Sequence, residues 1–267
     1  MRIVRFLSGG KVHIGREVDA SHALRIEGDM LGAWRVTDQR LAVEKLLAPI
    51  VPTDILCIGL NYREHARESG AGFPANPVLF IKSGNTLNNP FDPIYLPRNS
   101  QRMDYEGELV IVIGKAARHV PRERALEHVL GYTCANDVSA RDWQIDPALG
   151  GGQWARGKSF DGFCPLGPCL VTRDEIPNAN NLRMRTLLND QVMQNHNTSD
   201  MIFDVPAIIE SISATMTLRP GAVVLTGTPP GVGFARKPPV FMQSGDTVVI
   251  EIERIGRLEN PVVQEPE

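Results

Sequence analysis

The stretch MDYEGELVIVIGK, residues 103–115, places the acids Glu106 and Glu108 at the start of an uninterrupted apolar run. Side chains alternate between the two faces of a β-strand, so Glu106 and Glu108 would share a face, with their Cα atoms about 6–7 Å apart. The run LVIVI has no polar alternation, which predicts a strand that is buried on both faces. Two ionised carboxylates at the mouth of such a strand repel each other, so either their pKa values rise or a cation lies between them.

The segment YTCANDVSARDWQ, residues 132–144, supplies a third carboxylate. It reads as an apolar strand that ends in Asn136 and Asp137, so Asp137 could complete a three-carboxylate site with positions left for water and substrate. An all-oxygen site of this kind favours Mg²⁺, Mn²⁺ or Ca²⁺ over zinc, and Ca²⁺ could occupy it in a crystal. The competing interpretation places Glu106 and Glu108 at the exposed end of a strand and makes Asp137 the cap of the next helix.

The segment GLNYREHARESG, residues 59–70, predicts a short helix with Asn61 as its cap and Glu64 in a capping box. His65 and Glu68 are three residues apart and would share a face of that helix. A carboxylate beside an imidazole raises its pKa and orients the ring, which suits a general base that acts on water. An ordinary solvated helix face accounts for the same pair.

The segment GQWARGKS, residues 152–159, matches the phosphate-loop pattern letter for letter. That pattern requires a buried strand before it and a helix after it. Pro147 and a run of glycines precede the segment, and Gly162 and Pro165 follow it, so nucleotide binding is not expected. Lys158 is either a surface lysine or a charge presented to an anionic substrate or a developing oxyanion.

The segment LTGTPPGVG, residues 225–233, leaves a predicted strand and enters a loop fixed by proline and glycine. Such a rigid loop can direct Thr228 and backbone N–H groups at a ligand carboxylate or enolate. A purely structural turn is the alternative.

The composition is that of a globular protein: 42% of the 267 residues are apolar, 22% are charged, and the formal net charge is −3. No basic stripe indicates a nucleic-acid partner. The longest apolar runs are too short to span a bilayer, and the N-terminal MRIVRFLSGGK lacks the apolar core of a signal peptide, so we expect no membrane and a cytoplasmic location. The four cysteines, Cys57, Cys134, Cys164 and Cys169, form no C-x-x-C pair and are predicted to be reduced and mostly buried.

The remaining patterns predict a mixed, β-rich α+β fold rather than a doubly wound sheet, because strands and helices do not alternate regularly. Strands are expected at 2–7, 11–15, 55–59, 77–81, 108–114, 168–172, 222–227 and 246–252, with a hairpin that turns at Asn189-Asp190. Helices are expected at 40–47, 121–131 and 204–221, the last capped by Asp204. Pro49 and Pro52 indicate a boundary near residue 50, which divides a small β-rich domain, 1–50, from a larger one, 51–267.

Seven segments in this order resemble the fumarylacetoacetate hydrolase family. They are IGLNYREHARE, PVLFIKS, YEGELVIVIGK, GYTCANDVSARDWQ, RGKSFDGFCPLGP, LTGTPPGVG and GDTVVIEIERIGRLENPV, and together they cover about residues 50–262. Each motif alone is modest, but all seven in one chain are highly specific. Residues 1–50 resemble, less specifically, the small N-terminal portion that many bacterial members carry.

This resemblance implies the β-roll of the family, usually in a homodimer. By position, Glu106, Glu108 and Asp137 match the family's ligands for Mg²⁺ or Mn²⁺. His65 and Glu68 match a dyad on a mobile lid that activates water, and Lys158 matches a lysine that polarises the substrate oxygen. Arg141, Gln144 and Thr228 match residues that hold the acid or carbonyl groups of a small acidic dicarbonyl substrate.

The resemblance implies a metal-dependent hydrolase that cleaves a C–C bond in an acylpyruvate or 1,3-diketo acid, as in aromatic catabolism. The same scaffold supports oxaloacetate-type decarboxylation and isomerisation of 2-hydroxyhepta-2,4-diene-1,7-dioate, which share a metal-held enolate. The presence of both His65 and Glu68 favours hydrolysis, although decarboxylases of the family can carry the same pair. A non-catalytic, metal-stabilised binding protein is the alternative from another class.

Overall fold

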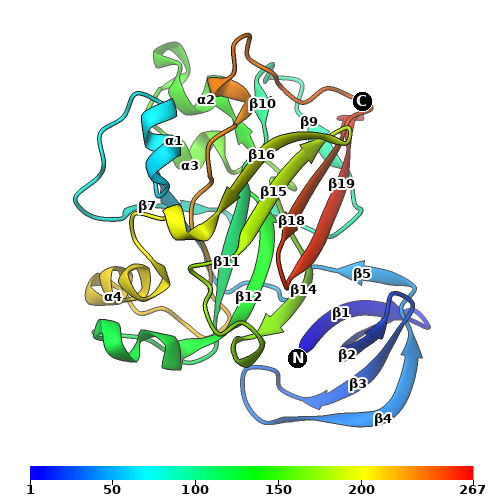
Figure 1. The fold of residues 1–267 in the computed structure, drawn as a ribbon. Coiled ribbons are helices and arrows are strands. Elements are labelled where there is room, and N and C mark those ends of the chain that lie inside the picture. The colour runs from blue at the N-terminus through cyan, green and yellow to red at the C-terminus, as the bar shows by residue number, and fades with distance from the viewer. Residues whose placement is uncertain (267) are drawn as a thin grey trace.

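The computed structural model describes residues 1–266, and β-strands form most of its regular structure (Figure 1). The N-terminal strands are β1 (Arg2–Ser8), β2 (Lys11–Asp19), β3 (His22–Gly28), β4 (Trp34–Ala42) and β5 (Lys45–Leu47). The strands expected at 2–7 and 11–15 are confirmed in β1 and β2, and Gly9 and Gly10 between them adopt positive φ, which glycine does without strain. The helix predicted at 40–47 is wrong. Residues 40–42 belong to β4, which pairs with β3, and residues 45–47 form β5, which pairs with β1, so sheet hydrogen bonds override the local spacing.

A twelve-stranded sheet runs through the whole molecule in the order β4-β3-β2-β1-β14-β12-β11-β17-β6-β7, with β5 on β1 and β8 on β14. Its remaining strands are β6 (Ile55–Gly59), β7 (Val78–Lys82), β8 (Leu87–Asn88), β11 (Gly107–Ile113), β12 (Val129–Asn136), β14 (Cys164–Thr172) and β17 (Val223–Leu225). Every residue of β11 is buried, as the unbroken apolar run predicts. It lies between β12 and β17, both antiparallel to it.

A second sheet of five strands has the order β16-β15-β18-β19-β9. Its members are β9 (Ile94–Leu96), β15 (Arg183–Leu188), β16 (Gln191–Asn197), β18 (Thr247–Ile252) and β19 (Gly256–Gln264), and a separate small pair joins β10 (Met103–Asp104) to β13 (Ser139–Ala140). The predicted hairpin is confirmed, since Asn189 and Asp190 both adopt the positive φ of a tight two-residue turn. One core cluster contains Leu109 and Ile111 of the large sheet and Ile250 of the small one, so the sheets share their core.

Helices are short and lie around the sheets. They are α1 (Arg63–Glu68), α2 (Arg141–Ile145), α3 (Trp154–Gly157) and α4 (Val205–Thr215), with 3₁₀ turns η1 (Gly84–Thr86), η2 (Arg122–His128), η3 (Pro147–Leu149), η4 (Arg173–Glu175), η5 (Thr198–Asp200) and η6 (Gly233–Ala235). Asp204 caps α4 as predicted, by accepting a hydrogen bond from the Ala207 N–H at 3.0 Å. The helix predicted at 121–131 is a 3₁₀ turn that stops where Val129 pairs with Ile113 and begins β12.

The predicted cap at Asn61 is wrong, and the expectation that residues 152–159 do not form a phosphate loop is confirmed. Asn61 does not cap α1, because Tyr62 occupies that position. The Asn61 amide instead donates to the carbonyl oxygens of Thr226 (2.7 Å) and Phe203 (3.0 Å). The phosphate-loop match at 152–159 is not a phosphate loop, since the turn η3, not a strand, precedes α3. The four cysteines are free and buried. Among residues 1–266 no helix is long and apolar enough to cross a membrane.

Candidate active site

Two antiparallel strands bring the three predicted metal ligands together. Glu106 immediately precedes β11, Glu108 lies within it, and Asp137 follows the end of β12, so all three meet at one edge of the sheet. A backbone hydrogen bond from the Asp137 N–H to the Glu106 carbonyl oxygen (2.8 Å) closes the pair of strands. One carboxylate oxygen of each residue lies within 4.8 Å of the others, and the side chains are buried. The alternative of an exposed strand end is therefore excluded.

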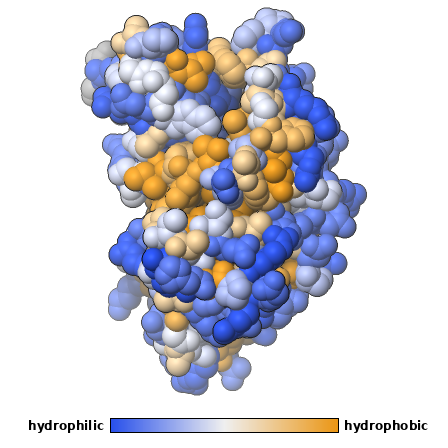
Figure 2. Space-filling view, turned by 90° about the vertical axis from the view of Figure 1, so that its left-hand side faces the viewer, coloured by the Kyte–Doolittle hydropathy of each residue, from blue (hydrophilic) through white to orange (hydrophobic). Residues whose placement is uncertain are grey.

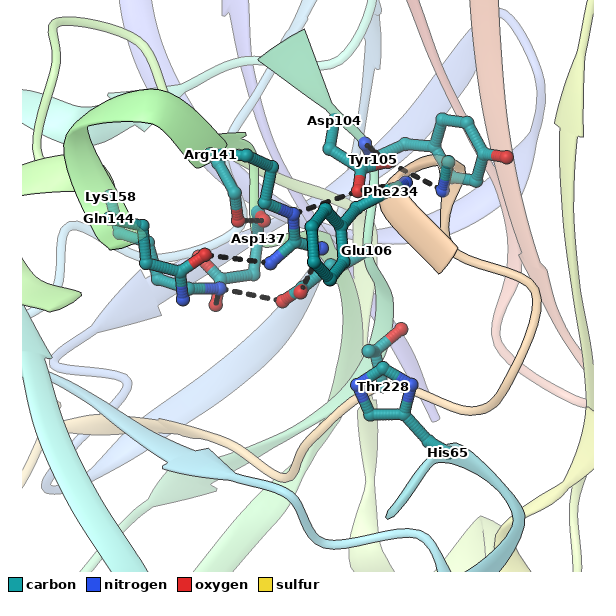
Figure 3. A network of polar contacts seen from close by, with 12 residues as sticks. His65, Asp104, Tyr105, Glu106, Asp137, Arg141, Gln144, Lys158, Thr228 and Phe234 are labelled. Atoms are coloured by element: carbon teal, nitrogen blue, oxygen red, sulfur yellow. Dashed lines mark hydrogen bonds and ion pairs between the residues drawn. The ribbon is translucent and has the colours of Figure 1, made fainter. Parts of the chain in front are cut away.

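Three cations pair with the acids, and Figure 3 shows two of them, Lys158 and Arg141. The Lys158 Nζ lies 2.6 Å from Glu106 Oε2 and 2.6 Å from Asp137 Oδ2. The Arg141 guanidinium donates through Nη2 to Glu106 Oε1 at 2.6 Å and through Nε to Asp104 Oδ2 at 2.8 Å. A third cation, Lys82, donates from Nζ to Asp137 Oδ1 at 2.6 Å. Glu106 and Asp137 are thus each paired with two cations.

Glu108 has a different environment from its two neighbours. It accepts a hydrogen bond from the Gly227 N–H (2.6 Å), but within residues 1–266 no cationic side chain forms an ion pair with it. Burial, together with the charges of Asp137 and Glu106, holds the pKa of Glu108 well above its ordinary value. Burial also opposes ionisation of Glu106, but the charges of Lys158 and Arg141 outweigh it and lower the pKa of Glu106.

This donor set fits an oxygen-preferring divalent cation. Three buried carboxylates converge, and one of them lacks a cation of its own and resists ionisation. A divalent ion would stabilise the ionised form of Glu108, whereas zinc would favour nitrogen and sulfur ligands that this cluster does not contain. The residues present therefore fit Mg²⁺ or Mn²⁺.

The pair on α1 is not an ordinary solvated helix face. His65 is 9% exposed, and its Nδ1 lies 3.3 Å from Glu68 Oε2. Both carboxylate oxygens of Glu68 accept from the Gly231 N–H at 3.0 Å, which fastens the helix to the 225–233 loop. Burial raises the pKa of Glu68, but hydrogen bonds from His65 and from the Gly231 backbone outweigh burial and lower it.

A cavity of about 240 Å³ connects these groups. Eight of the nine predicted site residues line it: His65, Glu106, Glu108, Asp137, Arg141, Gln144, Lys158 and Thr228. The ninth, Glu68, does not line the cavity but lies 3.3 Å from the Nδ1 of His65, which does. Apolar side chains complete the walls, namely Ile58, Phe80, Ile145, Trp154, Val232 and Phe234. A larger cleft of about 650 Å³, beside Trp143 and Phe160, contains none of the predicted site residues, so we place the site in the smaller cavity.

The three residues expected to hold the substrate also support the site itself. Arg141 donates through Nη1 to Gln144 Oε1 at 2.9 Å, so three of its five N–H groups are engaged within the protein. The Thr228 hydroxyl donates to the Gly107 carbonyl oxygen at 3.1 Å and accepts from Gln194 Nε2 at 2.8 Å. Contact of all three with a substrate stays a prediction.

Sequence reasoning missed two buried charged residues at the site, Lys82 and Asp104. Asp104 accepts from the backbone N–H groups of Gly233 (2.8 Å) and Phe234 (2.9 Å) as well as from Arg141, and so joins the wall of the cavity to the guanidinium. A signal for Lys82 was present, because it ends the apolar run PVLFIK, and a lysine buried at a strand end requires an acidic partner.

The β-rich fold and the buried acidic cluster are shared with an enzyme family whose members act on ketonic substrates. Residues 54–263 match the family described as "Fumarylacetoacetate (FAA) hydrolase C-terminal", and residues 1–49 match "Rv2993c-like, N-terminal". The chain belongs to the fumarylacetoacetate hydrolase family, and its β-rich fold is the fold of that family.

Individual relatives with different printed activities resemble the chain. It is 50% identical over 219 residues to "Oxaloacetate tautomerase fahd2, mitochondrial" of Xenopus laevis, which covers 82% of this chain and 68% of the frog protein. A 2-hydroxyhepta-2,4-diene-1,7-dioate isomerase from Mycobacterium marinum superposes with a TM-score of 0.86 at 41% identity over 100% of both chains. A fumarylacetoacetate hydrolase from Exiguobacterium antarcticum gives 0.88 at 38% identity over 99% of this chain and 100% of that one.

Proposed function

We propose that the protein is a divalent-metal-dependent keto–enol tautomerase of a small β-oxo dicarboxylic acid of the oxaloacetate class. One observation carries this proposal: an imidazole oriented by a carboxylate and a buried ammonium line the same small cavity as three converging carboxylates. In Figure 3, Lys158 and Gln144 lie on one side of Glu106 and His65 lies on the other. A substrate between them would meet a base and an acid at once.

The cavity volume and the relatives support a small substrate. About 240 Å³ lies below the roughly 300–1,000 Å³ of common ligand pockets, which suits a diacid of a few carbons. The printed name of the frog relative specifies oxaloacetate tautomerisation. We therefore prefer tautomerisation to the C–C hydrolysis expected from the sequence motifs.

The metal and the side chains would divide the chemistry. A divalent ion, Mg²⁺ or Mn²⁺, held by Glu106, Glu108 and Asp137, would supply Lewis-acid polarisation of the oxo group. Burial lowers the pKa of Lys158, but the charges of Asp137 and Glu106 outweigh burial and raise it, so its ammonium is a stable hydrogen-bond donor to an oxo oxygen.

Proton movement would occur between carbon and oxygen. Because the Nδ1 of His65 faces Glu68, the Nε2 is free to accept the proton from the carbon between the two carbonyl groups. The Lys158 ammonium keeps its proton and donates a hydrogen bond to the oxo oxygen as the enolate forms, and a proton from solvent then gives the enol. The reverse steps convert the enol to the ketone, and exchange with solvent restores His65. Arg141 and Gln144 hold a substrate carboxylate through their remaining N–H groups.

The test is the rate of oxaloacetate enol–keto conversion, followed by the enol absorbance with metal-stripped and Mn²⁺-loaded protein. We expect metal-dependent acceleration that falls about 100-fold or more in His65→Asn and in Lys158→Met. Glu64→Gln, on the same helix but paired with Arg67, is the matched control and should match the unmodified protein. The absence of metal-dependent acceleration would refute the proposal.

Hydrolysis of an acylpyruvate is the second candidate, because the His65–Glu68 pair can also activate water. Conversion of acetylpyruvate to acetate and pyruvate would establish the hydrolase. Conversion of oxaloacetate to pyruvate and CO₂ would establish the decarboxylase. Metal binding with no turnover of acetylpyruvate, fumarylpyruvate or oxaloacetate would favour the binding protein.

We also propose a homodimer formed through the outer edge of β7. This strand ends the order of the large sheet, and within residues 1–266 no strand pairs with its outer edge. Leu79 and Ile81 are 39% and 56% exposed, and Figure 2 shows apolar side chains gathered on the face that carries α1, β7 and α4. An antiparallel copy related by a two-fold axis at Phe80 would place Leu79 opposite Ile81.

Light scattering tests this interface. It should show a dimer that Ile81→Asp converts to a monomer, and a monomeric unmodified protein would refute this interface.

A cytoplasmic location stays a proposal. The printed name of the frog relative places that protein in mitochondria. Fractionation of the source cells, with detection of this protein in each fraction, would decide between the compartments.

A further inference from the structure

Lys82 is a buried cation with no part in the chemistry proposed above. It is the last residue of β7, two positions after Phe80, which lines the cavity. The Lys82 side chain is fully buried, and its Nζ donates to Asp137 Oδ1 (2.6 Å) and to the Val138 carbonyl oxygen (3.2 Å). Because Lys82 does not line the cavity, any effect on a ligand must pass through Asp137 or through its charge.

Asp137 is held by a lysine on each oxygen. Lys82 contacts Oδ1 from the buried side, and Lys158, which lines the cavity, contacts Oδ2. A carboxylate whose Oδ1 is engaged by a buried lysine can offer a cation only its Oδ2, whereas a free carboxylate rotates and can bind a cation through both oxygens. Lys82 therefore selects Oδ2 as the atom that faces the cavity.

The buried charges around the cavity are unequal in number. Four carboxylates (Asp104, Glu106, Glu108 and Asp137) and three cationic groups (Lys82, Arg141 and Lys158) are buried there, which gives a formal charge of −1 when every acid is ionised. A divalent ion would change this charge to +1. In the absence of the Lys82 ammonium, the loaded site would be neutral.

We propose that Lys82 is a positioning residue that also sets the charge of the loaded site, so that this site attracts a doubly negative substrate. This proposal depends on the proposed function in one respect, namely that the substrate carries two negative charges. The Lys82 charge repels a divalent ion and attracts an anion, so its removal affects the two ligands in opposite directions. Simple structural damage would weaken both.

The experiment measures Mn²⁺ binding, and then malonate binding to the Mn²⁺-loaded protein, by titration calorimetry. Lys82→Gln keeps an N–H donor for Asp137 and removes the charge. We expect this variant to bind Mn²⁺ about tenfold more tightly and malonate about tenfold more weakly. Lys45→Gln is the matched control, since Lys45 also pairs with a carboxylate, Asp92 (2.6 Å), but neither residue lines the cavity, and both affinities should be unchanged.

Two further variants make the result decisive. Lys82→Met removes the donor as well as the charge, so it should show the same loss of malonate affinity and a smaller gain for Mn²⁺, because Asp137 is no longer fixed. Lys82→Arg keeps the charge and should retain malonate affinity. If Lys82→Arg loses as much malonate affinity as Lys82→Gln, the charge is not the cause and the proposal is overturned.

Parallel loss of both affinities in Lys82→Gln, or no change in either, would also overturn the proposal. These measurements do not depend on turnover. Unmodified protein that binds Mn²⁺ and malonate but does not convert oxaloacetate would refute the proposed activity and leave the test of Lys82 valid.

Discussion

At the scale of single residues, the three clustered carboxylates differ in their partners. Glu106 accepts from Lys158 and Arg141, so Glu106→Gln leaves two buried cations without a full counter-charge and should cost about 3 kcal/mol of unfolding free energy. Glu108 has no such cation, and its pKa is raised by burial and by Asp137 and Glu106, so Glu108→Gln should be neutral or stabilising at pH 7.

Urea unfolding of both variants in the presence of EDTA measures this difference. Added Mn²⁺ should stabilise the unmodified protein and have little effect on either variant. Equal destabilisation by the two substitutions without metal would contradict the assignment of their partners.

Sequence reasoning located the acids but not their counter-ions. Glu106 and Glu108 were predictable because strand alternation fixes which side chains share a face. Lys82 and Asp104 were missed because their partners lie 55 and 37 residues away, and no local period connects such positions. Asn61 was misassigned as a helix cap for the same reason, since its amide joins segments that meet only after folding.

At the scale of elements, helix α1 depends on its contacts with the rest of the protein. It has six residues and would be marginal alone, and Glu68 fastens it to Gly231. The pKa of Glu68 is lowered, because the hydrogen bonds from His65 and Gly231 outweigh the opposing effect of burial, so the folded state favours the ionised form. This stabilisation is complete above the unfolded-state pKa of about 4.3 and is lost as the pH falls through the lower folded-state value.

Hydrogen exchange of residues 63–77 should therefore rise as the pH falls below about 4, after correction for intrinsic rates. Glu68→Gln should show the same rise at pH 7. Glu64→Gln, which removes an exposed acid paired with Arg67, should leave exchange unchanged. Protection of this segment that persists in Glu68→Gln would show that Gly231 does not hold the helix.

The elements that were mispredicted are those whose state depends on a distant partner. Residues 40–47 have helical spacing, but Leu47 pairs with Arg5 and Ala42 pairs with His22. Asp204 was predictable as a cap because its partner, Ala207, is three residues away. Local signals thus identified the Asp204 cap and the turn at Asn189-Asp190, while pairing across the sheet determined the state of residues 40–47.

At the scale of the whole molecule, the proposed division near residue 50 crosses a continuous sheet. β1 pairs with β14, with Ile3 opposite Leu170. One core cluster contains Ile3, Ile26 and Ile50 together with Val112 and Leu170. Residues 1–49 match a separate sequence family, but their apolar side chains pack against those of the larger part in one shared core.

Deletion of residues 1–50 should therefore destabilise the remainder. Burial of a side chain such as Ile3 or Leu170 contributes about 1.5–3 kcal/mol, and several are exposed at once, so Tm should fall by about 10 °C or more. In the full chain, Ile3→Ala should reproduce part of that loss, at about 2–4 kcal/mol. None of the first 50 residues lines the 240 Å³ cavity, so the fragment should still bind Mn²⁺ below its melting temperature. Calorimetry that shows an unchanged Tm would mean that residues 1–50 are an independent appendage and that the shared core contributes little.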